Sequence, residues 1–354
     1  MNKLKTLRAP IFVLSIPVLS LLVLPPCATW AAQAANDNPQ SHNCSTNGHT
    51  SYPTAAISNG VVNELLYLPA AKNGYYRATR YDWSGVVGCL AYKGHTYFGV
   101  WFTHYDPLLH DAISGPVEEF RSADGEGTLK YDQAKSGDPF IKIGVGVLRR
   151  TSDGPYKFRE TYPLIDGGKW TVHTGPSSAS FQQKLNSPIG IAYIYKKTLT
   201  LDKREPVLIL HHELKNTGTE TIDTQVYDHD FYVLDGAPTS QDIVVRFPFD
   251  LKAEQDLESG ARVEGRQIVY DRELQTGQTA MSLLTGYSSD TSSYDIVVEN
   301  RKTGVGVEQT GDQPISRFNF WSIRTTVCPE AFVHLKIAPG ETARWTIRYR
   351  FYAK

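Results

Sequence analysis

Two polar clusters in an otherwise apolar, strand-like sequence contain residue types that suit proton transfer. In residues 226–236, His229 lies between Asp228 and Asp230. Neighbouring carboxylates raise the proton affinity of an imidazole, which suits it to donating a proton near neutral pH. A lone histidine at such a position is more often structural, so the residue types leave both roles open.

A glutamate near the C-terminus is the second candidate for proton transfer. Glu330 interrupts the apolar run of residues 320–332, shortly before a Pro-Gly-Glu turn at 339–341. A carboxylate in such surroundings is either paired with an arginine or held with a shifted pKa for catalysis. Glu308 is a less enclosed alternative for the same role.

A third cluster, residues 74–85, combines Arg77, Arg80 and Trp83 with several tyrosines. Aromatic rings pack against the C–H faces of sugars, and guanidinium groups donate to sugar hydroxyls. The alternative is a strand whose arginines stack on neighbouring rings. The composition of this cluster favours neither interpretation over the other.

A fourth cluster, residues 101–120, places His110 among several carboxylates in a stretch without strand alternation. Such a stretch is either a functional loop on a rigid scaffold or a solvated connection. The sequence contains no Cys-x-x-Cys motif and no zinc-like Cys/His spacing. We therefore expect no metal site.

The segments that must position these clusters are predicted to be strands. Many short runs with period-two alternation, together with 28 glycines and 20 prolines, favour packed antiparallel sheets. Short helices are expected only at 61–68 and 253–258. The sequence thus predicts an all-β protein, a large antiparallel β-sandwich, with strands at 141–148, 193–201, 206–214, 221–226, 243–249, 293–298, 332–337 and 345–352.

The N-terminus has the pattern of a secretory signal peptide. A basic head precedes an apolar run at 11–24 and a small-x-small site at 32–34. This run is shorter than the roughly 20 apolar residues of a spanning helix. We therefore predict a cleaved signal peptide at 1–34, a disordered linker at 35–55 and one domain at 56–354, exported to the periplasm or secreted.

Charge and cysteine content restrict the partners. Cleavage leaves 33 basic and 37 acidic residues, a net charge near −4, so neither nucleic acid nor a membrane surface is an expected partner. Export permits disulfides, but Cys44, Cys89 and Cys328 cannot all pair. Cys89 and Cys328 lie in apolar contexts and could be buried thiols. The oligomeric state stays open.

The order of the clusters resembles the galactose mutarotase-like (aldose 1-epimerase) superfamily. That superfamily carries an Asn-His-x-x-Phe-Asn-Leu motif after a hairpin, and residues 228–234 are similar, with Asp228 in place of the asparagine. Residues 327–332 and the turn at 339–341 look like its C-terminal glutamate strand and turn. The arginine cluster together with 94–98 looks like its substrate-binding arginine segment and Gly-x-x-Tyr strand.

The resemblance covers most of residues 60–354 and is loose outside these motifs. A His-Gly signature of many relatives has no clean equivalent: either His110 takes its place, or Ser114-Gly115-Pro116 aligns with it and leaves no histidine. The family's additional aspartate has no match.

The resemblance implies a mechanism that needs neither metal nor organic cofactor. Glu330 would take the proton of the anomeric hydroxyl, and His229 would protonate the ring oxygen of a mono- or oligosaccharide. The implied substrate-binding residues are Arg80, Arg77, His110 and Trp83. The function implied is interconversion of sugar anomers; the alternatives are a polysaccharide lyase or hydrolase-type domain on the same fold, or a non-catalytic carbohydrate-binding protein.

Overall fold

Antiparallel sheets make up residues 51–354, the part of the chain that the computed structural model describes. All of these residues belong to the unit Ser41–Lys354. Within them, the 3-10 turn η1 (Thr291–Ser293) is the one helical element. The same residues contain no helix with the length and apolar character needed to cross a membrane. The prediction of an all-β protein is confirmed.

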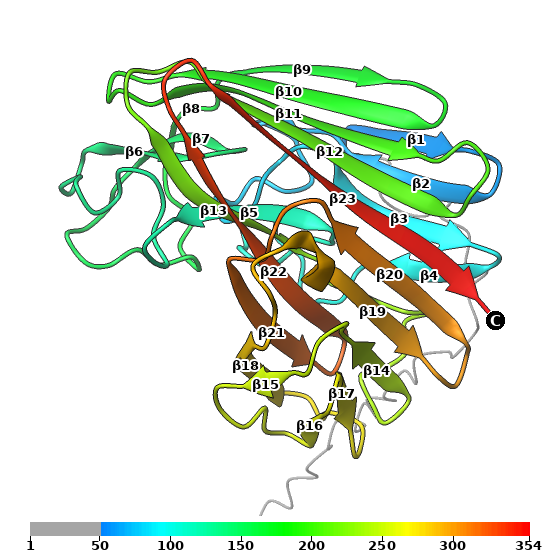
Figure 1. Cartoon of the computed structure of the whole chain (residues 1–354). Helices are drawn as coiled ribbons and strands as arrows, with labels where there is room; N and C mark the ends of the chain where they lie inside the picture. Colours follow the sequence, from blue (N-terminus) through cyan, green and yellow to red (C-terminus); the bar gives the residue numbers. More distant parts are fainter. Residues whose placement is uncertain (1–50) are drawn as a thin grey trace, which may run out of the picture. The chain divides into compact units, whose positions relative to one another are not determined.

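The largest sheet has ten strands, and its central strands lie side by side in one layer (Figure 1). Its order is β16 (Ala261–Glu264), β17 (Gln267–Tyr270), β14 (Ile243–Arg246), β19 (Asp295–Asn300), β20 (Val305–Gly311), β23 (Thr342–Ala353), β12 (Val207–Asn216), β11 (Ala192–Leu201), β10 (Ser178–Asn186) and β9 (Lys169–Thr174).

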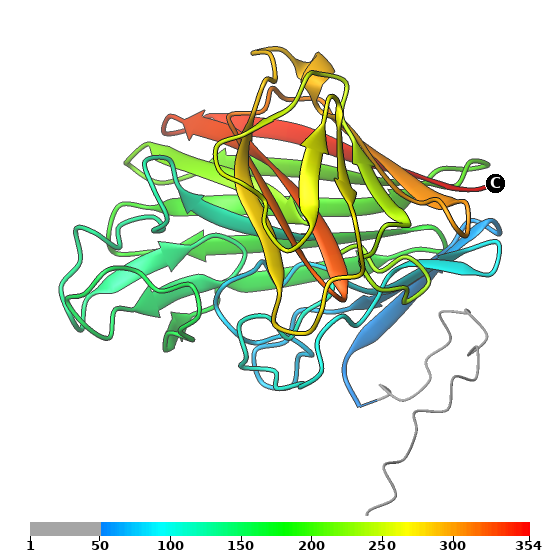
Figure 2. The same cartoon turned by 90° about the horizontal axis from the view of Figure 1, so that it is seen from below.

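A six-stranded sheet packs against this layer (Figures 1 and 2). Its order is β15 (Lys252–Ala253), β18 (Thr279–Thr285), β21 (Arg317–Ile323), β22 (Thr326–Ile337), β13 (Ile222–His229) and β5 (Val117–Ser122). Phe120 of β5 contacts the rings of Tyr195 and Trp345 in the larger sheet, with centroids 5.3 and 6.2 Å apart. The core of the sandwich therefore lies between these two sheets.

Two smaller sheets complete the domain. One has the order β1 (Thr54–Ser58), β2 (Val62–Tyr67), β3 (Val86–Tyr92) and β4 (His95–Phe98); the other has the order β6 (Pro139–Lys142), β7 (Gly146–Arg149) and β8 (Leu164–Asp166). Bridges from Tyr232 to Phe98 and to Val327 connect β4 to β22 of the six-stranded sheet.

Each predicted strand window overlaps an observed strand, with one change of organisation. The window 141–148 is a hairpin of β6 and β7, which pair with each other through Ile141 and Val147. Buried residues on both sides of the turn at 143–145 continue the apolar pattern through it. That continuity made two short strands look like one.

Both predicted helices are wrong. Residues 62–67 form β2, which pairs with β1 on one side and β3 on the other. Both faces of β2 are largely buried, so adjacent Leu65 and Leu66 gave an apolar run without clear alternation. Residues 253–258 continue from β15 into an irregular segment, in which the Gln255 N–H donates to Ser282 Oγ at 3.1 Å.

The N-terminal predictions fall mostly outside the described residues. The signal peptide, Cys44 and most of the predicted linker lie there, while β1 begins at Thr54, two residues before the predicted start of the domain. Cys89 of β3 is disulfide-bonded, which corrects its interpretation as a thiol. Cys328 is a buried free thiol, as its apolar context indicated.

Candidate functional site

A pocket of about 600 Å³ lies on the face of the six-stranded sheet that points away from the ten-stranded sheet. Its volume falls in the range of small-molecule sites, roughly 300–1,000 Å³. Side chains from β5, β13, β18, β21 and β22 line it, and loops supply the rest of the lining. The lining includes Arg80, Asp111, Arg121, His229, Asn319 and Glu330.

His229 and Glu330, about a hundred residues apart in sequence, meet in this pocket. His229 ends β13 and Glu330 lies on the neighbouring strand β22. His229 Nε2 lies 3.2 Å from Glu330 Oε1, and Asn319 Nδ2 donates to Glu330 Oε2 at 2.8 Å. Asn319 stands opposite Glu330 in the β21–β22 register, so strand pairing itself fixes the carboxylate.

The imidazole of His229 is enclosed by aromatic rings. It stacks on Phe231 at 3.8 Å and meets the edges of Trp321 and Tyr81 at 5.5 and 5.7 Å. Phe231 adopts a φ of 45°, a left-handed conformation that bulky residues rarely take, and its N–H donates to Cys328 Sγ. The ring of His229 is therefore held in one orientation.

Burial, followed by the nearby Arg80 guanidinium, lowers the pKa of His229 well below its ordinary value. The sequence-based expectation that Asp228 and Asp230 raise it is wrong. Successive strand residues point to opposite faces, and both aspartates face the sandwich interior, where Tyr349 Oη donates to them at 2.6 and 2.9 Å. At neutral pH the imidazole is neutral.

Burial raises the pKa of Glu330 to about 7, although Asn319, Arg121 and Arg80 oppose the shift. Both Glu330 and His229 are 3% exposed. The pKa of Glu330 is raised and that of His229 is lowered. Below pH 7 the pair therefore shares one proton, which lies on the Glu330 carboxyl group. A carboxyl group that titrates near pH 7 can both accept and release a proton there.

Glu119 lies beneath the residues that line the pocket, and its carboxylate binds three cationic side chains. Its carboxylate accepts from Arg80 Nε at 3.0 Å, Arg121 Nη2 at 3.2 Å, Lys142 Nζ at 3.3 Å and Tyr227 Oη at 2.5 Å. Burial alone would raise the pKa of Glu119, but the three cations hold it well below its ordinary range. This carboxylate thus stays ionised and anchors both arginines.

Arg80 projects from this anchor into the pocket. Its Nη1 donates to Asp111 Oδ1 at 2.6 Å, and its guanidinium carbon lies 4.5 Å from the Tyr81 ring and 4.4 Å from the Phe158 ring. His110 Nε2 in turn lies 2.8 Å from Asp111 Oδ2. His110 therefore does not line the pocket itself. It contacts and orients Asp111, which does line it.

The other sequence candidates lie elsewhere. Trp83 is buried and donates from Nε1 to the Ala78 carbonyl at 2.9 Å. Arg77 donates to the Lys72 carbonyl at 3.3 Å, and neither residue lines the pocket. Glu308 lies on β20 of the other sheet, where Arg350 Nε is 3.6 Å from its carboxylate. These placements favour structural roles for Trp83 and Arg77, in place of the proposed contacts with substrate.

The aromatic surface of the pocket comes from residues that sequence reasoning did not select. Trp101 stacks on Phe231 at 4.6 Å and meets the edge of Trp321 at 5.9 Å. Asp111, Arg121 and Asn319 were missed as well. Period-two counting from His229 and Glu330 could have found Phe231 and Phe332. Trp101 and Asp111 carry no such signal, because they come from a loop.

Segment 114–116, one of the two alignments of the missing His-Gly signature, packs under the same site. A Cβ atom on Gly115 would meet the carbonyl oxygens of Asp230 and His229 at 2.3 and 2.4 Å. Ser114 Oγ donates to the Val87 carbonyl at 2.6 Å. This segment therefore supports the backbone of His229 and contributes no side chain to the pocket.

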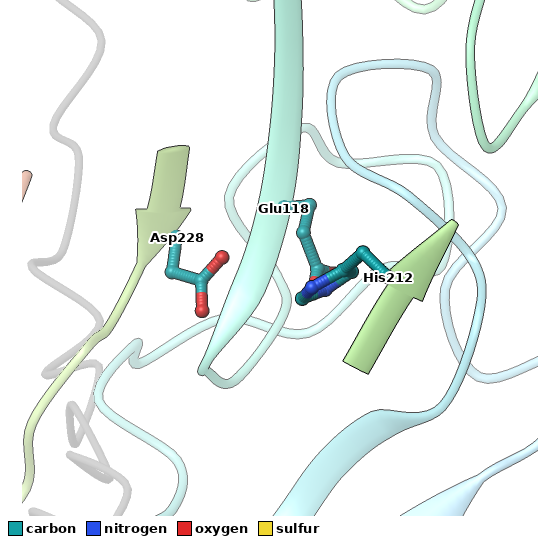
Figure 3. A group of neighbouring side chains, drawn as sticks. All are labelled: Glu118, His212 and Asp228. Atoms are coloured by element: carbon teal, nitrogen blue, oxygen red, sulfur yellow. The ribbon is translucent and has the colours of Figure 1, made fainter. Parts of the chain in front are cut away.

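A second polar cluster lies on the opposite face of the sheet, in the sandwich interior. Glu118, His212 and Asp228, from β5, β12 and β13, place one ligand-type atom each within 4.8 Å of one another (Figure 3). Glu118 Oε1 lies 2.7 Å from His212 Nε2, and Glu118 Oε2 accepts from Lys197 Nζ at 2.6 Å. Both oxygens of Glu118 are thus occupied by side chains, which indicates a structural network.

Comparison with known proteins identifies the fold. No protein-family model matches the chain, and no curated protein matches it. Among solved structures, a galactose mutarotase related enzyme from Lactobacillus acidophilus is 11% identical with a TM-score of 0.53, and the match covers 84% of this chain and 97% of that one.

Two further structures share this architecture. A GalM/aldose epimerase homologue from C. elegans is 14% identical, with a TM-score of 0.52 over 85% of this chain and 99% of the other. The Slr1438 protein from Synechocystis sp. PCC 6803 is 13% identical, with a TM-score of 0.53 over 85% and 96%. At such low identities the likeness concerns architecture alone, and at that level the chain is a galactose mutarotase-like β-sandwich.

Proposed function

We propose that this protein interconverts the anomers of a free sugar. The observation that carries the proposal is the 3.2 Å approach of His229 Nε2 to Glu330 Oε1 on the floor of a pocket of about 600 Å³. Ring opening needs one group that removes the anomeric proton and another that protonates the ring oxygen. The mutarotase-like fold supports the proposal, because related structures carry names of that activity.

In the proposed mechanism, His229 and Glu330 use the single proton that they share. Transfer of this proton from Glu330 to His229 gives a carboxylate and an imidazolium. The carboxylate then takes the proton of the anomeric hydroxyl while the imidazolium gives its proton to the ring oxygen. The C1–O5 bond breaks, the sugar becomes an open-chain aldehyde, and the pair returns to its neutral form.

Closure reverses these steps after rotation about the C1–C2 bond. Attack of the C5 hydroxyl on the other face of the aldehyde gives the opposite anomer, and each proton returns to its origin. Trp101 and Trp321 offer flat surfaces for the C–H face of the ring. Arg80, held by Glu119 and Asp111, can donate to sugar hydroxyls.

Anomer exchange measured by NMR or polarimetry on a panel of aldoses tests the proposal. Purified wild type should exceed the buffer rate, and His229→Asn should reduce the excess about 10²- to 10⁴-fold. Binding of glycans without any excess exchange would show that the protein is a carbohydrate-binding protein instead. Cleavage of a polysaccharide would point to lyase or hydrolase chemistry on the same fold.

We also propose export, because the basic head, the apolar run and the small-x-small site of residues 1–34 fit a cleaved signal peptide. The protein would then act on sugars outside the cytoplasm. Mass spectrometry of the exported protein should find a mature N-terminus near Ala35. An intact Met1 in the membrane fraction would refute cleavage.

A further inference from the structure

We infer that the sugar bound in this pocket is anionic and carries a carboxylate or phosphate at C6, recognised by Arg121 and Arg317. This inference rests on the proposed function for the position of the sugar ring. Its own evidence is the pattern of satisfied and unsatisfied guanidinium groups along the pocket. Arg80, Arg121, Arg159 and Arg317 all line it.

Three of these arginines, Arg80, Arg121 and Arg317, have carboxylate partners that differ in exposure. Arg80 bonds Asp111 and Glu119, whose side chains are 32% and 0% exposed, so neither carboxylate is readily displaced. Arg317 has one carboxylate partner, Glu126, at 3.4 Å. Arg121 shares Glu119 and also reaches the same oxygen, Glu126 Oε1, at 3.2 Å. Two guanidinium groups thus converge on a single carboxylate oxygen.

Arg121 and Arg317 also each have an N–H group that makes no hydrogen bond. The Nε–H of each is buried and has no hydrogen-bond partner. A buried donor without a partner costs about 1–3 kcal/mol. Both guanidinium groups lie against the Phe332 ring, 5.8 and 5.3 Å from its centroid, so packing holds them in place. Such an arrangement suits a planar or tetrahedral anion that accepts several hydrogen bonds.

Glu126 has the properties of a replaceable occupant of this position. It comes from the loop after β5, and its side chain is 60% exposed. An exposed glutamate is held weakly, because exposed ion pairs contribute about 0–1 kcal/mol. Its carboxylate shows which chemical group the two arginines accept. A ligand carboxylate or phosphate can displace it and accept from the Nη groups that now contact Glu126.

Strand register places this anion position at the right distance from the reacting atoms. Arg317 stands two residues from Asn319 on β21, and Asn319 is opposite Glu330. Two residues of a strand span about 7 Å. This separation is close to one pyranose ring with its C6 substituent. An anomeric hydroxyl at Glu330 therefore leaves the C6 group near Arg317, which favours a hexuronate or a hexose 6-phosphate.

Calorimetric titration and anomer-exchange NMR, run with D-glucuronate, D-glucose 6-phosphate and D-glucose, test the inference. At low ionic strength, wild type should bind an anionic sugar at least tenfold more tightly than D-glucose. The preferred anion separates the two sources: a uronate preference indicates a glycan or its fragments, and a phosphate preference indicates a metabolite. Arg317→Gln should remove the preference for the anionic sugar.

Two further variants sharpen the result. Glu126→Gln removes the resident carboxylate and should tighten binding of the anionic sugar several-fold relative to binding of D-glucose. Arg344→Gln removes an exposed arginine paired with Glu213 far from the pocket lining, and should change nothing. Unchanged melting temperatures would show that each variant is folded.

The outcomes distinguish this inference from the proposed function. Exchange and binding of D-glucose as good as those of the anionic sugars, with no effect of Arg317→Gln, overturns the inference and keeps anomer interconversion. Arg317-dependent binding of an anionic sugar without any exchange keeps the inference and rejects the proposed activity. Failure to bind any of the three sugars rejects both.

Discussion

Each face of the six-stranded sheet carries a polar cluster that contains a buried glutamate and a histidine. The two glutamates differ in whether a neighbouring cation keeps them ionised. On the interior face, Lys197 and His212 occupy both oxygens of Glu118. Burial would raise the pKa of Glu118, but Lys197 and then His212 outweigh it and hold the value at about 2. On the pocket face, burial prevails for Glu330 and raises its pKa to about 7.

The contrast shows how one strand serves stability and chemistry at once. Adjacent residues on β5, Glu118 and Glu119, point to opposite faces, as do Asp228 and His229 on β13. The interior cluster has its charges paired and lies between two sheets, so it stabilises their packing. The pocket pair lacks a bonded cation and opens to a cavity, so its proton remains transferable.

The largest expected effect is on the pocket face. Glu330→Gln keeps the shape of the side chain and can still accept from Asn319, but it cannot take up a proton. We expect the exchange rate at saturating sugar to fall about 10²- to 10⁴-fold, with binding largely kept. Glu308→Gln is the matched control and should be nearly silent. A silent Glu330→Gln would remove Glu330 from the mechanism.

The next effect concerns the interior face. Glu118→Gln leaves the buried Lys197 ammonium without its partner. Removing one member of a buried ion pair costs about 3–5 kcal/mol in the free energy of unfolding. Urea unfolding should show this loss, while the remaining folded protein keeps its exchange rate within a few-fold. Full stability combined with lost activity would mean that the two faces are not separate in function.

The pH dependence of the exchange rate tests the proton held by His229 and Glu330 without any mutation. The active pair holds one proton. His229 is neutral, so this proton lies on Glu330 and is lost with the pKa of Glu330, about 7. The enzymatic exchange rate should therefore fall about tenfold per pH unit above pH 7, and should be level just below it. Initial rates between pH 5 and 9, corrected for buffer catalysis, measure this. A rate that rises through pH 7 would show that Glu330 acts as a carboxylate alone.

The smallest effect on the exchange rate is expected at Asp228. Burial, then the charge of Glu118, raises its pKa to about 8, so the group is neutral at pH 7. Because the folded-state pKa lies above the unfolded one, Asp228 favours folding most below pH 4, and this contribution is lost as pH rises toward 8. Asn cannot ionise in the unfolded chain, so Asp228→Asn should raise the free energy of unfolding relative to wild type at pH 7, and the gain should shrink as the pH falls toward 4.

The same variant should flatten the dependence of stability on pH between 4 and 8, measured by urea unfolding at several pH values. The exchange rate should be unchanged, since Asp228 faces away from the pocket. A steeper pH dependence in the variant would contradict the raised pKa.

The sequence predicted the fold class and included among its candidates the two residues that meet in the pocket. Alternation identified several of the long strands, such as β11, β12 and β23, because burial of one face of a sheet imposes a period of two on the chain. His229 and Glu330 were candidates because each places a titratable group beside or within an apolar strand, and the resemblance to the superfamily selected Glu330 over Glu308. Helix predictions failed where strands are buried on both faces, as in β2.

Only the tertiary structure decided what surrounds these two residues. Neighbours in sequence suggested that Asp228 and Asp230 act on His229, but the pleat of β13 turns them to the interior, and the groups that reach His229 come from distant strands and loops. Arg121, Arg317 and Glu126 converge through strand register and a loop conformation. Local sequence cannot specify such contacts, because the pKa of a buried group and the partners of an arginine depend on which segments fold against it.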